Sequence, residues 1–186
     1  MIAWKKILNH SDVLASKKEV AKSIQNCAIN ISDKYHNKNP IILCLMNGGL
    51  FFTAKLCEHL HFPLRIDYLH ATRYRGNTTG SDLQWVKSPQ FNLANEHILL
   101  LDDVYDEGVT LKEVTSALGA QNPASLACAV LVDKQHQRKP LGFSVEYSAI
   151  TLPDRYLFGC GMDYLGHWRH LPQIYAVHDN LSLIHI

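Results

Sequence analysis

The sequence lacks several motifs that mark common classes of protein. It has no Cys-x-x-Cys pair, so a zinc site built on paired thiolates is not expected. It contains neither Gly-x-x-x-x-Gly-Lys-Ser/Thr nor Gly-x-Gly-x-x-Gly, which argues against a P-loop or a Rossmann-type nucleotide binder. No apolar run approaches the roughly 18 residues of a membrane span, and the first residues lack the apolar core of a signal peptide. We therefore expect no membrane partner.

An excess of charge of either sign is also missing. The 186 residues include 18 Lys and Arg against 17 Asp and Glu, which leaves a formal net charge of +1. Because this balance creates no general field for nucleic acid, no nucleic-acid partner is expected and an anionic ligand needs a local site. The five cysteines mostly lie in apolar runs, which is typical of buried, reduced thiols in a cytoplasmic protein. The eleven histidines form no His-Glu-x-x-His pair and are expected at the surface or in supporting positions.

Hydrophobic residues make up 47% of the chain, enough to fill the core of one domain over 1–186. Their spacing predicts helices over 11–36, 50–59 and 111–118, and strands over 41–46, 64–72, 98–101, 125–132 and 143–150. The polar segment 73–89 is predicted to be a long loop or mobile hairpin, and the chain from Pro153 onward to be irregular. This succession predicts an α/β fold with a mainly parallel sheet flanked by helices, in which ligands bind beyond the carboxyl ends of the strands.

The most informative segment covers 98–111 and reads ILLLDDVYDEGVTL. Four aliphatic residues form a buried strand, and Asp102 and Asp103 follow at its end. Neighbouring strand residues point to opposite faces, but at a strand's end the chain can turn and present both acids to one ligand. Two carboxylates accept hydrogen bonds from a vicinal diol such as that of ribose, and they also suit Mg²⁺.

The residues that follow indicate an anion site. Asp106, Glu107, Gly108, Val109 and Thr110 form a glycine-containing turn at the start of a helix. Free backbone N–H groups and the helix dipole favour a phosphate there, and the hydroxyl of Thr110 adds a donor. Asp106 and Glu107 would repel that phosphate unless they point elsewhere. A simpler alternative is that these acids only cap and solvate the helix start.

The segment resembles the phosphoribosyl pyrophosphate (PRPP) signature of type I phosphoribosyltransferases: an apolar strand, two acids, two apolar residues and Asp-Thr-Gly-x-Thr. Glu107 stands where the family usually has threonine, a departure that affects one side-chain contact to the 5-phosphate. Further segments are similar to the hypoxanthine-guanine branch, in the same order. They are 45–52 (pyrophosphate loop, with Asn47 where lysine is common), 71–74 with 79–80 (mobile loop, with Arg73 where serine is usual), 130–134 (the strand ending in a purine-contacting lysine), and 152–159, 162–164 and 168–169 (purine and metal segment).

The resemblance implies the type I phosphoribosyltransferase fold, with a small hood of C-terminal and N-terminal residues, about 153–186, over the purine site. It implies purine salvage: the 5-phosphoribosyl group of PRPP passes to hypoxanthine or guanine and gives IMP or GMP and pyrophosphate, with Mg²⁺ as cofactor. We also expect a homodimer or homotetramer. The alternatives are a nucleotide-binding regulator on the same fold, a xanthine-preferring enzyme, and a pyrimidine or adenine enzyme, against which Lys134 and 153–156 speak.

The resemblance also assigns roles to individual residues. Asp106 is the general base that removes the N7 proton of the purine. Asp102 and Asp103 hold the ribose hydroxyls and, with Asp163, the metal. The other roles are phosphate binding by Glu107, Gly108, Val109 and Thr110, pyrophosphate binding by Asn47, Gly48 and Arg169, purine binding by Lys134, Tyr156, Leu157 and Asp163, and a mobile loop with Arg73 and Tyr74. From residue type alone, Arg169 could form a surface ion pair, Tyr156 could pack in the core and Lys134 could lie in solvent.

Overall fold

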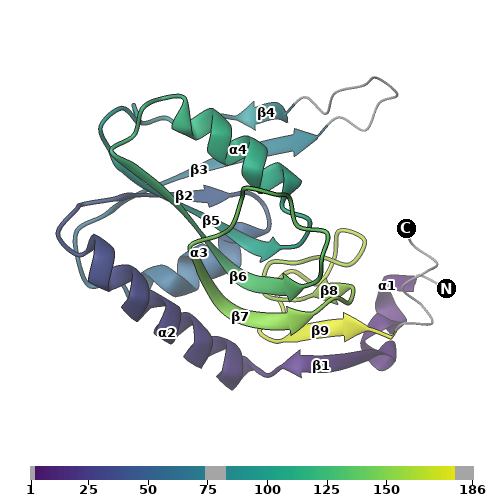
Figure 1. Ribbon diagram of the computed structural model, residues 1–186. Coiled ribbons are helices and arrows are strands. Elements are labelled where there is room, and N and C mark those ends of the chain that lie inside the picture. Colours follow the sequence, from purple (N-terminus) through teal and green to yellow (C-terminus); the bar gives the residue numbers. More distant parts are fainter. Residues whose placement is uncertain (1–2, 74–82, 179–186) are drawn as a thin grey trace.

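A computed structural model of the protein describes residues 3–73 and 83–178 (Figure 1). Its centre is a six-stranded sheet with the strand order β4-β3-β2-β5-β6-β7. The strands are β2 (Ile41–Leu45), β3 (Arg65–Arg73), β4 (Leu83–Lys87), β5 (His97–Tyr105), β6 (Ser125–Gln135) and β7 (Tyr147–Pro153). All neighbours pair in parallel except β3 and β4, which form an antiparallel pair at one edge. The prediction of an α/β fold with a mainly parallel sheet is confirmed.

Helices cover both faces of this sheet. α2 (Lys17–Tyr35) and α3 (Gly49–Cys57) pack on one face, and α4 (Val109–Gly119) packs on the other (Figure 1). α2 begins at a capping box, in which the backbone N–H of Ser16 donates to the carboxylate of Glu19 at 2.8 Å and the Ser16 hydroxyl accepts from the Glu19 N–H. None of the helices in the described ranges has the length and apolar character required to cross a membrane.

The central strands contain uninterrupted apolar runs because helices cover them on both sides. All five residues of β2 are buried. Along β5, Leu99 and Leu101 pack with residues of α2 and α3, whereas Ile98 and Leu100 pack with residues of α4. A strand buried in this way needs an uninterrupted hydrophobic run, which is the pattern that the sequence shows at 41–45 and 98–101.

A smaller antiparallel sheet brings together segments from near both ends of the chain. It has the order β1-β9-β8, with β1 (Ser11–Ala15), β9 (Ile174–Val177) and β8 (Leu157–Phe158), and follows the short helices α1 (Ala3–Lys6) and η1 (Ile7–His10). Two predictions are wrong here: 11–15 is a strand rather than the start of a helix, and the chain after Pro153 is not wholly irregular. Local periodicity could not reveal these strands, because β1 is stabilised by pairing with residues about 160 positions away.

Other boundaries also differ from the predictions. β7 begins at Tyr147 rather than at residue 143. Within 73–89, the segment predicted to be a long loop or mobile hairpin, β4 forms the second strand of a hairpin with β3. β5 continues to Tyr105, so Asp102 and Asp103 lie inside a strand that pairs with β6 and not beyond its end. Tyr74, which the sequence places in a mobile loop, falls within 74–82 and so lies outside the described residues.

Candidate active site

A cavity of about 650 Å³ opens at the carboxyl ends of β2, β5 and β6. It lies where parallel α/β sheets generally bind their ligands. The predicted site residues that line it are Asn47, Gly48, Asp102, Asp103, Asp106, Glu107, Gly108, Val109, Thr110, Lys134, Tyr156, Leu157, Asp163 and Arg169. Arg73 is the last residue of β3. The fold thus collects residues from five separate parts of the sequence into one concave site.

The paired acids lie deep in this cavity. The backbone N–H of Asp103 donates to Oδ1 of Asp102 at 2.9 Å. Burial raises the pKa of both carboxyls, and the neighbouring charge of Asp103 raises that of Asp102 further. The loop after β2 packs directly on them: a Cβ added to Gly48 would lie 2.2 Å from Oδ2 of Asp103, so any other residue here would displace that carboxylate. The peptide bond between Met46 and Asn47 in this loop is cis.

Arg169 lies between two of the cavity's carboxylates. Its Nη2 is 2.6 Å from Oδ1 of Asp163, and its Nη1 donates to the carbonyl oxygen of Gly161 at 2.6 Å. The same Nη1 is 3.9 Å from Oδ2 of Asp103. One guanidinium therefore faces three carboxylates, those of Asp102, Asp103 and Asp163, and this part of the cavity keeps an excess of negative charge. Such a set of oxygen ligands fits a hard divalent cation.

The turn before α4 forms the anion-binding part of the cavity. Gly108 is the N-cap of α4 and has φ of 68°, a left-handed conformation that favours glycine. A Cβ at this position would also lie 2.2 Å from the ring of Tyr105. No side chain caps this end of α4, and Val109 and Thr110 line the cavity. The uncapped N–H groups and the helix dipole therefore offer a site for a phosphate.

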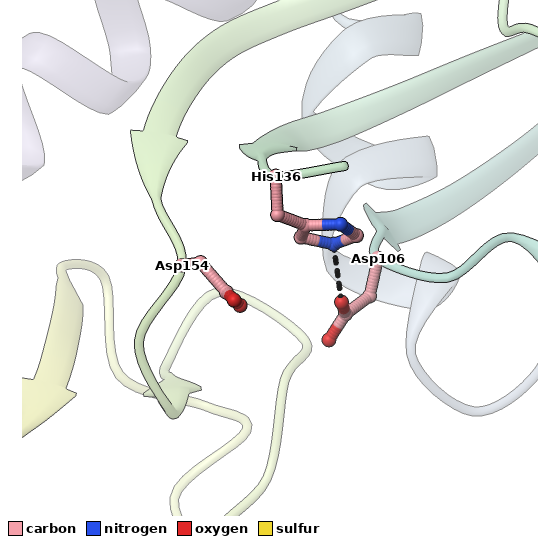
Figure 2. Close-up of side chains that lie close together, drawn as sticks. All are labelled: Asp106, His136 and Asp154. Carbon is pink, nitrogen blue, oxygen red and sulfur yellow. Dashed lines mark hydrogen bonds and ion pairs between the residues drawn. The ribbon is translucent and has the colours of Figure 1, made fainter. Parts of the chain in front are cut away.

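The two acids of this turn are paired with side chains from the segment that ends and follows β6. Lys134 Nζ donates to Oδ2 of Asp106 at 2.6 Å. His136 Nε2 lies 2.7 Å from Oδ1 of Asp106 (Figure 2). Arg138 Nε is 3.5 Å from Oε1 of Glu107. Both negative side chains thus have partners away from the helix N-terminus, which reduces the repulsion that they would exert on a bound phosphate.

Three contributors to this cluster were missed in the sequence: His136, Arg138 and Asp154. Arg138 Nη1 donates to Oδ2 of Asp154 at 2.7 Å, and Lys134 Nζ is 3.8 Å from Oδ1 of Asp154. A usable signal existed for His136, because it lies two residues after Lys134, which was already assigned to the site, just beyond the end of β6. No comparable signal existed for Asp154, which meets Asp106 only in the folded chain.

Ligand atoms of Asp106, His136 and Asp154 lie within 4.8 Å of one another, so this group has the spacing of a metal site. Its charges make it a weaker candidate than the group around Arg169. The two carboxylates already face the cations of Lys134 and Arg138. The excess of negative charge lies instead at Asp102, Asp103 and Asp163.

Comparison with known proteins agrees with this geometry. Residues 10–164 match the family model described as "Phosphoribosyl transferase domain". The chain is 31% identical to the hypoxanthine-guanine-xanthine phosphoribosyltransferase of Tritrichomonas foetus, over 87% of this chain and 88% of that protein. It is 32% identical to the hypoxanthine phosphoribosyltransferase of Buchnera aphidicola subsp. Schizaphis graminum, over 87% of this chain and 93% of that protein.

A solved structure extends the similarity to the fold. A hypoxanthine-guanine-xanthine phosphoribosyltransferase superposes with a TM-score of 0.82 at 29% sequence identity, covering 90% of this chain and 97% of the other. The chain therefore belongs to the phosphoribosyl transferase domain family and, within it, to the hypoxanthine-guanine branch.

Proposed function

We propose that the protein is a purine-salvage enzyme that transfers the 5-phosphoribosyl group of PRPP to hypoxanthine or guanine, giving IMP or GMP and pyrophosphate. The observation that carries this proposal is the single cavity. It contains an acid pair suited to ribose hydroxyls, an uncapped helix N-terminus suited to a phosphate, and an adjacent lysine and carboxylate. A PRPP molecule and a purine together require these three elements in one site.

The pair of Asp106 and Lys134 matches one edge of a 6-oxopurine. In such a purine, N7 and the 6-oxo oxygen are neighbours on the same edge. Lys134 offers only donors and so suits the oxo group, while the carboxylate of Asp106 accepts the proton of N7. The two side-chain atoms are 2.6 Å apart, close enough to serve both neighbours of the base. Adenine carries an amino group at position 6, which would oppose the ammonium donor to donor.

Tyr156 and Leu157 complete the purine site in this proposal. Tyr156 lines the cavity and makes an edge-to-face contact with Tyr164, with ring centroids 5.7 Å apart. This contact fixes the ring that would stack on the purine. Leu157 is buried in β8, so it would contribute backbone groups to the edge of the base.

The reaction displaces pyrophosphate from C1 of the ribose. As N9 of the purine forms its bond to C1, the bond from C1 to the pyrophosphate oxygen breaks, and Asp106 takes the proton from N7. Backbone N–H groups at Asn47 and Gly48, with the guanidinium of Arg169, bind the leaving pyrophosphate. Thr110 and the start of α4 hold the 5-phosphate.

Asp102, Asp103 and Asp163 would hold Mg²⁺, directly or through its waters. The excess negative charge of this group fits a divalent cation. Bound there, Mg²⁺ supplies positive charge that neutralises the pyrophosphate as it leaves.

The remaining features belong to the same proposal. The chain forms one domain over 1–186 with a hood from about residue 153, functions as a homodimer or homotetramer, and is cytoplasmic. All five cysteines are free, which supports a reducing compartment. A second candidate is preference for xanthine, supported by the printed name of the T. foetus relative, which includes that base.

Turnover with PRPP and each purine base tests the proposal. We expect formation of IMP from hypoxanthine or GMP from guanine, complete loss of activity in EDTA, and recovery on adding Mg²⁺. Adenine should be used about 10⁴-fold less efficiently in kcat/KM, the scale of discrimination by a site built on one hydrogen bond. Lys134→Gln, whose amide offers both a donor and an acceptor, should narrow that ratio mainly by losing activity with hypoxanthine. Undiminished activity in EDTA, or none with any 6-oxopurine, would overturn the assignment.

A further inference from the structure

We propose that His136 is a positioning residue for Asp106, which it holds as a neutral imidazole so that one carboxylate oxygen stays turned toward the purine. This inference rests on the proposed function, in which Asp106 accepts the N7 proton. The side chain of His136 is only 5% exposed, and it is not among the residues that line the cavity. It comes from the segment that follows β6, and its ring contacts the carboxylate of Asp106 (Figure 2). It therefore acts through the carboxylate and not on the substrate.

The hydrogen bonds of His136 determine its tautomer. The backbone N–H of Arg138 lies 3.0 Å from Nδ1 of His136. Because a backbone N–H can only donate, Nδ1 must accept and carries no proton. The proton of the neutral ring is then on Nε2, which donates to Oδ1 of Asp106 at 2.7 Å. A doubly protonated ring would place two donors against each other at Nδ1, so the loop geometry favours the neutral form.

The hydrogen bond from His136 to Asp106 differs from the contacts that the other charged groups make with this carboxylate. Lys134 Nζ binds Oδ2 at 2.6 Å and is the group that we assign to the 6-oxo oxygen. Arg138 Nη2 is 3.7 Å from Oδ1, but this guanidinium is 53% exposed and pairs more closely with Asp154. Only His136 among these partners is both buried and within hydrogen-bond distance of Oδ1. It fixes Oδ1 and thereby leaves Oδ2, beside Lys134, to receive the proton.

The same arrangement argues against a metal ion at this group. Nε2 of His136 carries a proton, so it offers no lone pair to a cation in the geometry observed. Removing that proton for a metal would break the bond to Asp106 and add positive charge beside Lys134 and Arg138. His136 is therefore better suited to donating to the carboxylate of Asp106 than to binding a metal ion.

Two substitutions test the role of His136 through turnover. His136→Ala removes the donor, and His136→Gln places an amide N–H close to where Nε2 stood. We expect the alanine variant to lose about 10-fold in kcat with little change in the KM for PRPP, the scale of one hydrogen bond to a charged group. The kcat–pH profile of the alanine variant should also differ from that of the wild type, because the carboxylate of Asp106 loses the donor that His136 supplies. The glutamine variant should recover most of both changes.

The matched control is His61→Ala, which removes an exposed histidine that does not line the cavity and should leave kcat and the pH profile unchanged. A kcat and a pH profile that stay at wild-type values in His136→Ala would overturn the inference. So would equal losses in the alanine and glutamine variants with both still folded, because a donor would then not be what matters.

Imidazole ¹⁵N spectra of the ligand-free wild-type protein provide a measurement that needs no turnover. We expect the His136 signals of a neutral ring with the proton on Nε2. A ring protonated on Nδ1 overturns the inference even in an active enzyme. If the wild type transfers to no 6-oxopurine, the proposed function fails, while the spectrum still decides whether His136 donates to Asp106.

Discussion

Two acidic sites of this protein have similarly small exposed fractions, but their carboxylates have different partners. Asp67 in β3 and Asp103 in β5 are equally buried, each 8% exposed. Asp67 accepts from the backbone N–H of Tyr68 at 2.8 Å and of Gln90 at 2.6 Å, and from Lys87 Nζ at 3.2 Å. Burial acts to raise its pKa, but these donors outweigh that effect and hold the pKa of Asp67 below its usual value. The chain itself satisfies this carboxylate.

Asp102 accepts from the backbone N–H of Asp103, and Asp103 accepts from that of Val104, but within the described residues neither acid has a cation at hydrogen-bond distance. Burial raises the pKa of both, and the nearest cation, Arg169, is 3.9 Å from Asp103 and closer to Asp163. A protein tolerates this cost where a ligand later supplies the missing partners. At the same exposed fraction the two sites therefore differ. Asp67 has Lys87 and two backbone donors and stabilises the junction of β3 and β4, whereas the acid pair loses more of its solvation and is suited to a cation and ribose.

Among the acids of the cavity, the largest effect is expected for Asp106→Asn, which keeps the size of the side chain and removes its basicity. We expect kcat to fall by about 10²–10⁴-fold, the usual contribution of a general base. The melting temperature should fall modestly, because an amide cannot accept from both Lys134 and His136, whose side chains are largely buried although that of Asp106 is 39% exposed. IMP formation and melting temperature, measured on one preparation, check both statements. If kcat stays near normal, Glu107→Gln should be tested, because Glu107 is the adjacent acid in the turn.

Asp67→Asn tests whether the carboxylate of Asp67 stabilises the fold. One position of the amide would present N–H groups to the donors of Gln90 or Tyr68, and Lys87 would lose its counter-ion. We expect the free energy of unfolding to fall by about 2–3 kcal/mol, with kcat of the folded protein retained. Denaturant unfolding measures the loss. Asp33→Asn, at an exposed position of α2, is the control with the same change in charge. An Asp67 variant as stable as that control would remove the distinction between the two sites.

Asp103→Asn should have the opposite effect on stability. Because the raised pKa of Asp103 marks an ionised form that the fold disfavours, a neutral isostere should raise the free energy of unfolding by about 1 kcal/mol without Mg²⁺. Added Mg²⁺ should stabilise the wild type more than the variant, because a ligand of the folded state stabilises it by mass action. Melting curves with and without Mg²⁺ check this. Equal Mg²⁺ stabilisation of both proteins would place the metal elsewhere.

The smallest expected effect is on pH dependence, and its sign differs between the two sites. The lowered pKa of Asp67 means that its stabilisation is present above the unfolded-state pKa, near 4, and is lost as pH falls through the folded value. The advantage of wild type over Asp67→Asn should therefore shrink on acidification. For Asp103 the pKa is raised, so its cost grows as pH rises and the advantage of Asp103→Asn should be larger at pH 7 than at pH 4. The free energy of unfolding of the wild type and both variants, measured at several pH values, tests these two expectations. The same pH trend in both variants would contradict them.

Much of the large sheet could be predicted because its signals are local. Strands such as 41–45 are uninterrupted apolar runs, and the acid pair with its glycine turn has a spacing that a random sequence rarely produces. The small sheet could not be predicted in the same way. β1 has only five residues, continues the apolar spacing of α2, and becomes a strand only by pairing with β9. Its conformation depends on a non-local partner.

The sequence by itself determined the class of fold and the kinds of side chain available for PRPP and a purine, because periodicity and motif spacing are properties of neighbouring residues. The tertiary structure alone decided which charges meet. Asp106 faces Lys134 and His136, Glu107 faces Arg138, and Asp102 and Asp103 keep a raised pKa while Asp67 does not. The physical reason is that the pKa and orientation of a carboxylate depend on burial and on donors within a few ångströms, and these donors come from distant parts of the chain.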